Sequence, residues 1–548
     1  HHAGYLEPPV LEEVRDEVLR LVLSKPFLGS NLKYDAQVLY TWLGVYPCDL
    51  APTWDSQVLD ALARPDAFEH GLKPITRHWL RRDVLELKDL GGVEHFWELP
   101  YATQALYAAA GDARNSYDVV QQLRNEVLPR SLVEYYVRIE QPVIPVLAEM
   151  ELEGLPLDRK ELLRLTDEYE QRGVRVQQEL RALGFDGNPN ADVAIARFLY
   201  EELHLPMLVR TPKVQRGSVA LDVLRRLQLL LLPNGDSREL RAVQLFIEWS
   251  EVDKALSTFL LPPLRSGSDV FLFDLLQTAA KTGRLSTKPN SQNWPEGIRD
   301  ICAARDGEEL VDGDLGQIEV RVGAHLSQDP DMLRDFRNNE DVYVSLGRSM
   351  GFPEERLDKH GALRKNIKTV YLADMYESAP PKIQAIGLRQ DNYIPLKEAR
   401  DLQERIHKAR PRYYTWREEY IEESRRRGYA LDELFGRRRD MPRLHAIDPA
   451  TRGAAERETC NWPHQTGAGG ILKLSMRGVQ ELCRSAGGAL LNQVHDELLA
   501  RVGALTVPQW AEFRHEFAKR MTEVVELSVP LVAEVGRGRT WASAKGEA

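Results

Sequence analysis

The fold is decided by the stretch Val311-Asp312-Gly313-Asp314-Leu315-Gly316-Gln317-Ile318-Glu319-Val320-Arg321. An apolar run ends at Leu310-Val311, which predicts the end of a strand, and two glycines then interrupt it. From Ile318 onward the apolar residues follow the spacing of one helical face. We therefore expect Asp314 where a strand stops. Its free carboxylate would suit Mg²⁺, which takes one or two protein carboxylates and leaves its other sites to water and phosphate. On this stretch alone an ordinary turn aspartate fits equally well, because turns favour Asp anyway.

A second stretch, 490–502, consists of two apolar runs around the polar tip His495-Asp496-Glu497. It predicts a tight hairpin, although the tip lacks the glycine of the strongest turn signals. Two carboxylates, one on each element, could then share a pair of Mg²⁺ ions about 3.5–4 Å apart. The hairpin therefore favours a metal site built from Asp314 and Asp496.

The two stretches resemble conserved motifs of the family A DNA polymerases. Residues 314–319 resemble motif A and residues 493–497 resemble motif C, and a stretch similar to motif B lies between them in the expected order. The general type is the large fragment of bacterial DNA polymerase I and its phage relatives. The resemblance extends, at varying strength, from about residue 20 to the C-terminus.

The resemblance implies a multidomain protein of mixed α/β and α+β class. It would form a right hand with palm, fingers and thumb, preceded by a truncated exonuclease-like domain of ribonuclease H-like fold. The length of 548 residues also exceeds what a single core accommodates. The expected domains are the exonuclease-like domain 1–134, the thumb 135–280, the palm 281–332 and 446–548, and the fingers 333–445.

The resemblance also implies the chemistry. Asp314, Asp496 and the Leu315 carbonyl would hold two Mg²⁺ ions, with Mn²⁺ as a substitute, to activate the primer 3′-hydroxyl and stabilise the charge on the departing pyrophosphate. Lys368 would act as general acid, and Arg364 would grip the γ-phosphate. The expected nucleotide-binding residues are Gln317, Glu319, Arg364, Lys368, Leu372 and Tyr376.

The stretch similar to motif B is predicted to be helical, because four of its residues recur at four-residue spacing. They are Arg364, Lys368, Leu372 and Tyr376. The stripe would span about 18 Å, although a stripe of this kind is more often a solvated face. Two positions depart from the family pattern, because Leu372 replaces a Phe or Tyr and Glu377 replaces a Gly. Tyr371 is an alternative source of the missing ring.

The resemblance implies that Glu319, a bulky residue, packs with Tyr376 beneath the sugar of the nucleotide and so excludes ribonucleotides. Other polar residues are expected to contact DNA. The DNA-contacting set is Arg284, Arg457, Asn461, Gln465, His495 and Glu497. The first four could reach minor-groove acceptors, which every base pair presents. The alternative for Arg284 is an ordinary surface arginine. The alternative for Arg457, Asn461 and Gln465 is a set of core polar groups with satisfied hydrogen bonds. Segments 211–218 and 437–439 would meet phosphates or simply face water.

The N-terminal part resembles the second and third motifs of the attached 3′–5′ exonuclease. Asp35 lies in the first of these stretches and Asp112 in the other, but Asp112 stands five rather than four positions after Tyr107. The first motif, an Asp-x-Glu strand, would precede the chain. We therefore expect a proofreading fold without proofreading activity, because a nuclease missing a carboxylate pair loses most of its metal site.

Composition limits the function classes. With 72 Lys and Arg against 83 Asp and Glu, the net charge of −11 excludes bulk electrostatic DNA binding and requires local basic clusters. The 4 cysteines lack metal-ligand spacing, and no apolar run reaches about 18 residues, so we expect a reducing, cytoplasmic setting in a bacterial or phage-infected cell, with an organelle as the alternative.

The expected partners are primer-template DNA and deoxynucleoside triphosphates. We expect a monomer without membrane contact, with a processivity factor as a candidate accessory partner. Two other classes remain open, a 3′–5′ exonuclease and a catalytically silent DNA-binding module. The first is disfavoured by its incomplete carboxylate set, and the second by the joint presence of Asp314, Lys368, Arg364 and Asp496.

Overall fold

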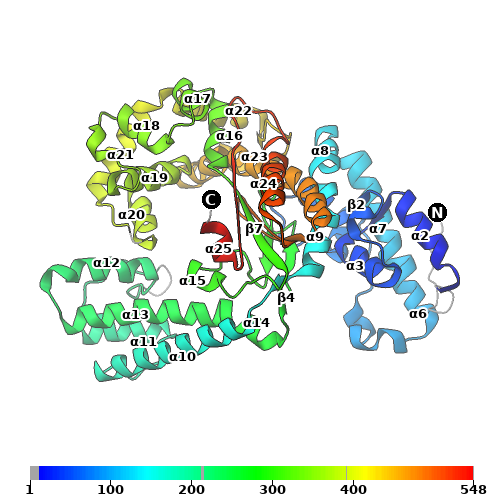
Figure 1. Cartoon of the computed structure of the whole chain (residues 1–548), viewed down its shortest axis with the longest axis horizontal. Helices are drawn as coiled ribbons and strands as arrows, with labels where there is room; N and C mark the ends of the chain where they lie inside the picture. Colours follow the sequence, from blue (N-terminus) through cyan, green and yellow to red (C-terminus); the bar gives the residue numbers. More distant parts are fainter. Residues whose placement is uncertain (1–11, 212–214, 391, 547–548) are drawn as a thin grey trace.

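A computed structural model describes residues 12–211, 215–390 and 392–546. An antiparallel sheet of four strands, in the order β10-β11-β7-β12, lies at its centre (Figure 1). The strands are β7 (Glu308–Leu315), β10 (Ala489–Val494), β11 (Glu497–Gly503) and β12 (Ala533–Gly538). The predicted hairpin is therefore confirmed as β10–β11, and β7 lies between β11 and β12.

The prediction that Gly313 interrupts the strand is wrong, because β7 continues through it to Leu315. Gly313 pairs with Leu498 on one side and Val535 on the other. A Cβ at this position would lie 2.5 Å from Phe517 Cε1 and 2.8 Å from Met521 Sδ. The glycine lets a helix pack closely on the strand rather than breaking it.

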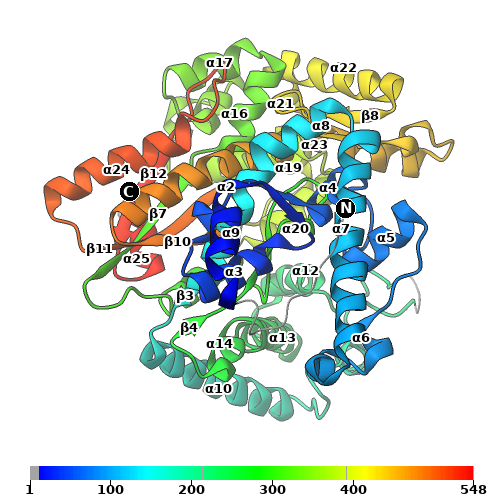
Figure 2. The same ribbon diagram turned by 90° about the vertical axis from the view of Figure 1, so that its right-hand side faces the viewer.

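Helices cover the sheet and carry most of the site. They are α9 (Gln141–Glu153), α15 (Glu296–Arg299), α16 (Ile318–Ser327), α23 (Pro449–Ser485), α24 (Val507–Thr522) and α25 (Trp541–Gly546). The predicted helix after motif A is confirmed as α16, with Ile318 and Val322 buried. α9 packs against β10 and α23, at the centre of the molecule (Figure 2).

Apart from α9, which lies at the centre, most of the segment predicted as the thumb is a long helical arm. It contains α10 (Arg159–Ala182), α11 (Asp192–Ala196), α12 (Leu221–Leu231), α13 (Arg238–Lys254) and α14 (Leu261–Ser266). The Asp158 carboxylate caps α10 by accepting from the amides of Lys160 and Glu161 at 2.9 and 3.1 Å. Short strands β3 (Leu155–Pro156), β4 (Val270–Phe271), β5 (Asp274–Leu276) and β6 (Ser286–Lys288) join the arm to the centre. Residues 212–214 of the predicted phosphate-contacting segment 211–218 lie outside the described residues.

The segment predicted as the fingers is helical, as expected. It contains α17 (Pro330–Arg337), α18 (Val342–Ser349), α19 (Ala362–Met375), α20 (Pro380–Arg389), α21 (Leu396–Ala409) and α22 (Pro411–Arg427). A small hairpin of β8 (Tyr429–Leu431) and β9 (Arg438–Asp440) follows and leads into α23. This arm has its own buried core, which includes Ile367, Tyr371 and Tyr413.

The N-terminal part combines helices with one parallel pair of strands, β1 (Phe27–Gly29) and β2 (Thr53–Asp55). Its helices are α2 (Arg15–Ser24), α3 (Leu32–Leu43), α4 (Ser56–Ala63), α5 (Leu72–Leu80), α6 (Tyr101–Ala105), α7 (Arg114–Gln122) and α8 (Arg130–Tyr135). Its buried residues and those of the central sheet form one continuous hydrophobic cluster. The N-terminal part is thus packed firmly on the centre rather than tethered to it.

A buried ionic cluster ties distant segments together. The ammonium of Lys473, on α23, lies 2.7 and 2.8 Å from the two carboxylate oxygens of Glu140, which directly precedes α9. Arg437, between β8 and β9, donates to the same carboxylate at 3.2 Å. All three side chains are almost fully buried, so each charge depends on its partners for solvation.

The two arms touch at their ends. α12 packs against α20, and the Arg225 guanidinium donates to the carbonyl of Leu388 (Figures 1 and 2). Among the helices of the described ranges, none combines the length and the apolar character that a membrane span requires.

Candidate active site

Two strand ends bring Asp314 and Asp496 together. Asp314 is the penultimate residue of β7 and pairs in register with Glu497, the first residue of β11. Asp496 lies in the two-residue turn before β11, where His495 takes a φ of 55°. The amide of Leu315 donates to the carbonyl of Asp496 at 3.0 Å, which locks the turn to the end of β7.

The electrostatics of this pair fit a divalent cation. Burial, and then the neighbouring Asp496, raise the pKa of Asp314 to about 6. Burial also raises the pKa of Asp496. Two half-buried carboxylates that oppose each other's ionisation are a donor set that a bound cation would stabilise. Within the described ranges, no group of three or more His, Cys, Asp or Glu residues is arranged to hold a metal.

Glu319 lies at the centre of a polar chain beside the carboxylates. Its carboxylate pairs with Arg284 and accepts from the hydroxyl of Tyr376, so the predicted contact between Glu319 and Tyr376 is present. A cavity of about 180 Å³ opens there and is lined in part by Arg284, Glu319, Gly469, His495 and Asp496. Gln317 caps α16 nearby in a left-handed conformation, and its buried side-chain oxygen lacks a partner among the described residues.

α19 carries the predicted nucleotide-binding stripe away from this cavity. Tyr376 is the C-cap of α19 and contacts Glu319. Arg364 lies twelve residues earlier, about 18 Å along the helix axis. Arg364 donates to Asp341 at 3.0 Å, and both Arg364 and Lys368 lie over the ring of Tyr343. Lys368 is exposed.

The choice between Tyr371 and Leu372 is decided by packing. Tyr371 is fully buried in the core of this arm, where its hydroxyl lies 3.6 Å from the sulfur of Met332. Leu372 is only half-buried and shares the stripe with Lys368. The idea that Tyr371 supplies the missing ring is therefore wrong, because its side chain faces the interior.

A polar stripe on α23 leads into the same cavity. Arg457 is exposed, and Asn461 and Gln465 are half-buried, at the predicted four-residue spacing. The next residue in the series is Gly469, which lines the cavity beside Arg284. The stripe and the carboxylate pair therefore belong to one continuous surface.

Glu497 does not lie on this surface, contrary to prediction. Its side chain is 2% exposed and is held by internal partners. Trp541 Nε1 donates to it at 2.7 Å, Lys545 contacts its other oxygen, and an Arg299 nitrogen lies 3.7 Å away. The strand pairing turns Glu497 toward α25, so it cannot shape a primer end from there.

Sequence reasoning missed two residues beside the pair. Lys545 lies on α25, with its ammonium 3.7 Å from a carboxylate oxygen of Asp314. Asp312 lies two residues before Asp314 on β7 and receives a 3.2 Å hydrogen bond from Trp541 Nε1. Side chains two residues apart on a strand share a face, so the sequence could have placed Asp312 beside Asp314. No sequence pattern near either residue indicated a contact with Lys545.

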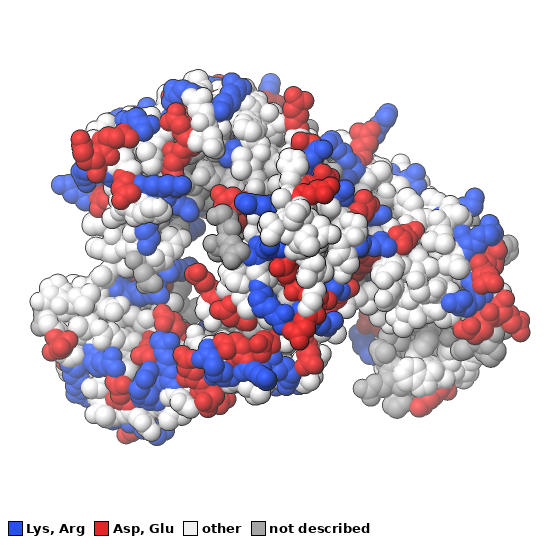
Figure 3. Space-filling view, viewed as in Figure 1, with Lys and Arg blue, Asp and Glu red and all other residues white. Residues whose placement is uncertain are grey.

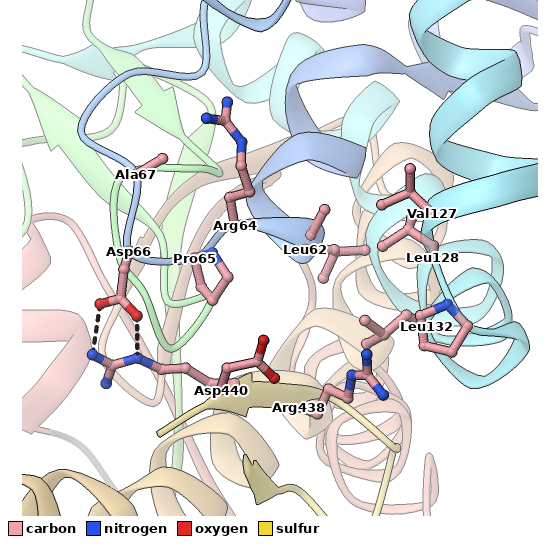
Figure 4. A pocket seen from close by; sticks show the side chains of 13 residues that line it. Leu62, Arg64, Pro65, Asp66, Ala67, Val127, Leu128, Leu132, Arg438 and Asp440 are labelled. Atoms are coloured by element: carbon pink, nitrogen blue, oxygen red, sulfur yellow. Dashed lines mark hydrogen bonds and ion pairs between the residues drawn. The ribbon is translucent and has the colours of Figure 1, made fainter. Parts of the chain in front are cut away.

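The arginines of segment 437–439 were expected to contact template phosphate or face water. Arg437 and Arg439 do neither, because they are 4% and 5% exposed. Arg437 belongs to the buried Glu140 cluster, and Arg439 forms a two-point ion pair with Asp66 at 2.6 and 2.9 Å. That pair borders a separate cavity of about 320 Å³ between the N-terminal part and β9 (Figure 4). Only Arg438 remains half-buried.

The two predicted exonuclease residues have different surroundings. Asp112 is ion-paired with Lys73, whose ammonium also lies 4.3 Å from the centre of the Tyr107 ring. Burial, and then Asp55, raise the pKa of Asp35 to about 6. One carboxylate oxygen of Asp55 caps α4, and the other accepts from the amide of Leu32 at 2.7 Å.

On the face of the molecule shown in Figure 3, the surface charge is mixed. Lys and Arg are interspersed with Asp and Glu over both arms and the centre (Figure 3). Any contact with a polyanion must therefore use local groups such as Arg284 and the α23 stripe.

Comparison with known proteins bears on all of these features. The profile of DNA polymerase family A matches residues 159–543. A thermostable DNA polymerase I of Thermus thermophilus is 34% identical over 470 residues, which cover 83% of this chain and 53% of that protein. The Thermus aquaticus enzyme is 36% identical over 431 residues. The DNA polymerase I of Pseudomonas aeruginosa is 29% identical over 558 residues, covering 96% of this chain and 58% of that protein.

A solved structure is also similar. It is described as the POL domain of Pol1 from M. smegmatis in complex with DNA primer-template and dNTP. The TM-score is 0.83 at 25% identity, over 99% of this chain and 91% of that one. The chain spans about half the length of the curated relatives it matches.

Proposed function

The chain belongs to DNA polymerase family A and has the right-hand fold of that family, and from this we propose that it is a template-directed DNA polymerase. Its substrates would be primer-template DNA and deoxynucleoside triphosphates, the molecules bound in the Pol1 complex. The observation that carries the proposal is the register of β7 and β11, which brings Asp314 and Asp496 to one point beside the Glu319 cavity.

Each group has a role consistent with its position. Asp314, Asp496 and the Leu315 carbonyl would hold divalent cations, whose chemistry when bound is to acidify the primer 3′-hydroxyl and stabilise charge on the leaving pyrophosphate. Lys368 would donate a proton to that pyrophosphate, and Arg364 would exchange Asp341 for the γ-phosphate. Gln317, Leu372 and Tyr376 would hold the base and sugar of the incoming nucleotide.

DNA would be held by the surface that surrounds the cavity. Arg284 and His495 border the primer end, and Arg457, Asn461 and Gln465 would follow the minor groove, where acceptors occur on every base pair. We further propose that the chain works as a monomer in the cytoplasm, with Mg²⁺ as its ion.

The test is primer extension by Asp314→Asn and Asp496→Asn. Both should abolish extension and keep primer-template affinity within a few-fold, because these charges are needed chiefly in the transition state. Glu534→Gln is the matched control, since Glu534 pairs in register with Asp314 but is exposed on β12, and it should retain most activity. Extension by either Asn variant at the parent rate would refute the assignment.

A further inference from the structure

α19 ends in a turn that is unusual for the residue it contains. Tyr376 is the C-cap residue, and Glu377 follows with a φ of 50°, in the left-handed region where glycine is the default. The amide of Glu377 donates to the Asp374 carbonyl at 2.8 Å, and the amide of Ser378 donates to the Ala373 carbonyl at 3.0 Å. This is a Schellman turn, and the chain retains it although the family's glycine is replaced by a glutamate.

Arg417 of α22 holds this turn from the interior. One guanidinium nitrogen lies 2.6 Å from the Glu377 carboxylate, and another donates to the backbone carbonyl of Asp374 at 3.4 Å. The Arg417 side chain is about 10% exposed, so the ion pair is well shielded from water. The residues that contact the Asp374 carboxylate in turn are Gln403, His407 and Tyr414. The end of α19 is therefore fixed by side chains of α21 and α22.

The fixed turn determines where Tyr376 lies. Tyr376 stands between the two residues that Arg417 contacts, and its hydroxyl reaches Glu319. Glu319 is paired in turn with Arg284, which lines the same cavity as Asp496. Polar contacts and one stretch of backbone thus connect α22 in the fingers to Arg284, which lines the same cavity as Asp496.

We propose that Arg417 and Glu377 form a bracket that positions Tyr376 and thereby sets selection for the sugar of the incoming nucleotide. The inference rests on the proposed function and on the expectation, implied by the family resemblance, that Glu319 packs with Tyr376 beneath that sugar. Arg417 and Glu377 act through Tyr376 and are positioning residues. When Arg417 fixes the backbone at Asp374 and Glu377, the Tyr376 ring occupies the space that a 2′-hydroxyl would need, whereas a Tyr376 that can move would leave that space open.

The decisive variant is Glu377→Gly, because it separates stability from selection. Glycine relieves the left-handed strain and thereby offsets part of the stability lost with the shielded ion pair, so the melting temperature should change less than it does in Arg417→Met. Loss of the ion pair should nevertheless lower the ratio of deoxynucleotide to ribonucleotide efficiency about tenfold or more, as expected when one contact of a discriminating site is lost. Arg417→Met should lower the same ratio, and Arg417→Lys, which keeps the charge, should restore part of it. Single-turnover incorporation gives the ratio, and thermal unfolding gives the stability.

Two controls make the result specific. Arg81→Gly removes another left-handed non-glycine residue, at the C-terminal end of α5 in the N-terminal part, and should leave the ratio unchanged. Glu319→Ala opens the space beneath the sugar directly and sets the upper limit of the effect. If Glu377→Gly and Arg417→Met both keep the parent ratio while Glu319→Ala lowers it, the bracket has no role in selection. A parent chain that extends no primer would instead refute the proposed function.

Discussion

Leu372 is the residue at which this chain departs most visibly from its family. Its half-buried side chain offers apolar contact on the nucleotide stripe but no ring, and the adjacent tyrosine faces the core. Stacking of a base on an aromatic ring is worth about 1–3 kcal/mol. Incorporation should therefore be limited by weak nucleotide binding.

Substitution of Leu372 tests this directly. Leu372→Phe should tighten nucleotide binding and keep the preference for normal over 3′-deoxy nucleotides. Leu372→Tyr should narrow that preference, because its hydroxyl can replace the contact that the 3′-hydroxyl makes. Single-turnover incorporation of both nucleotides by the parent and both variants decides the matter. An unchanged preference in Leu372→Tyr would contradict the placement of Leu372 against the nucleotide.

Lys545 offers a second prediction at a single residue. Its ammonium joins buried Glu497 to Asp314, so Lys545→Met would leave Glu497 with less countercharge beside the carboxylate pair. Because a positive charge that competes with the metal is removed, we expect a lower Mg²⁺ concentration for half-maximal extension and tighter Mn²⁺ binding to the free protein, measured by electron paramagnetic resonance. Lys545→Arg should behave like the parent, as should Lys519→Met, which removes an exposed lysine of α24. Unchanged Mn²⁺ affinity in Lys545→Met would contradict this role.

The site residues whose positions in the fold were predicted correctly share a local signal. Asp314 and Asp496 stand at strand ends, and Lys368 and Leu372 recur at helical spacing, so short-range patterns located them. Glu497, Arg437 and Arg439 were misjudged because their partners lie far away in sequence, at Lys545, Glu140 and Asp66. A charged side chain looks solvent-exposed in sequence until its buried partner is known.

At the scale of elements, the hairpin of β8 and β9 carries a buried acid. Asp432 is fully buried, and one carboxylate oxygen accepts from the amide of Leu434 at 3.0 Å. The other oxygen lacks a hydrogen-bond partner among the described residues. Burial raises the pKa of Asp432 to about 7. A raised pKa means that its stabilising contribution, complete below the unfolded value, is lost as the pH rises through 7.

Asp432→Asn should therefore stabilise the protein increasingly between pH 5 and pH 8.5. The gain at the higher pH is at most about 4 kcal/mol, since each pKa unit corresponds to about 1.4 kcal/mol. Urea unfolding at both pH values measures it. Equal effects at the two pH values would show that the carboxyl group does not titrate in this range.

Helices and strands could be predicted where apolar residues recur at the spacing of one face. They could not be predicted where their course depends on contacts with residues far away in sequence. α16, α19 and the β10–β11 hairpin followed from periodicity. The course of β7 through Gly313 did not, because the reason is contact with Phe517 and Met521 two hundred residues later. The central position of α9 likewise depends on β10 and α23, which a local pattern cannot supply.

At the scale of the whole molecule, the Glu140 cluster joins α9, α23 and the hairpin of β8 and β9. Lys473→Met should cost about 3–5 kcal/mol, because it breaks a buried pair and leaves a carboxylate undercompensated. Lys397→Met, at an exposed position on α21, should change stability by less than about 0.5 kcal/mol. Denaturant unfolding compares the two. A small effect for Lys473→Met would indicate that Arg437 alone neutralises Glu140.

The contact between α12 and α20 has a topological consequence. Because Arg225 reaches the Leu388 carbonyl, the two arms and the sheet form a closed loop of protein. If primer-template DNA lies between the arms, as the proposed function requires, a linear duplex would enter from its end, whereas a primed closed circle has no end to offer. Capture of a circle must wait for the arms to part, and once they rejoin, the circle and the protein are linked like two rings of a chain.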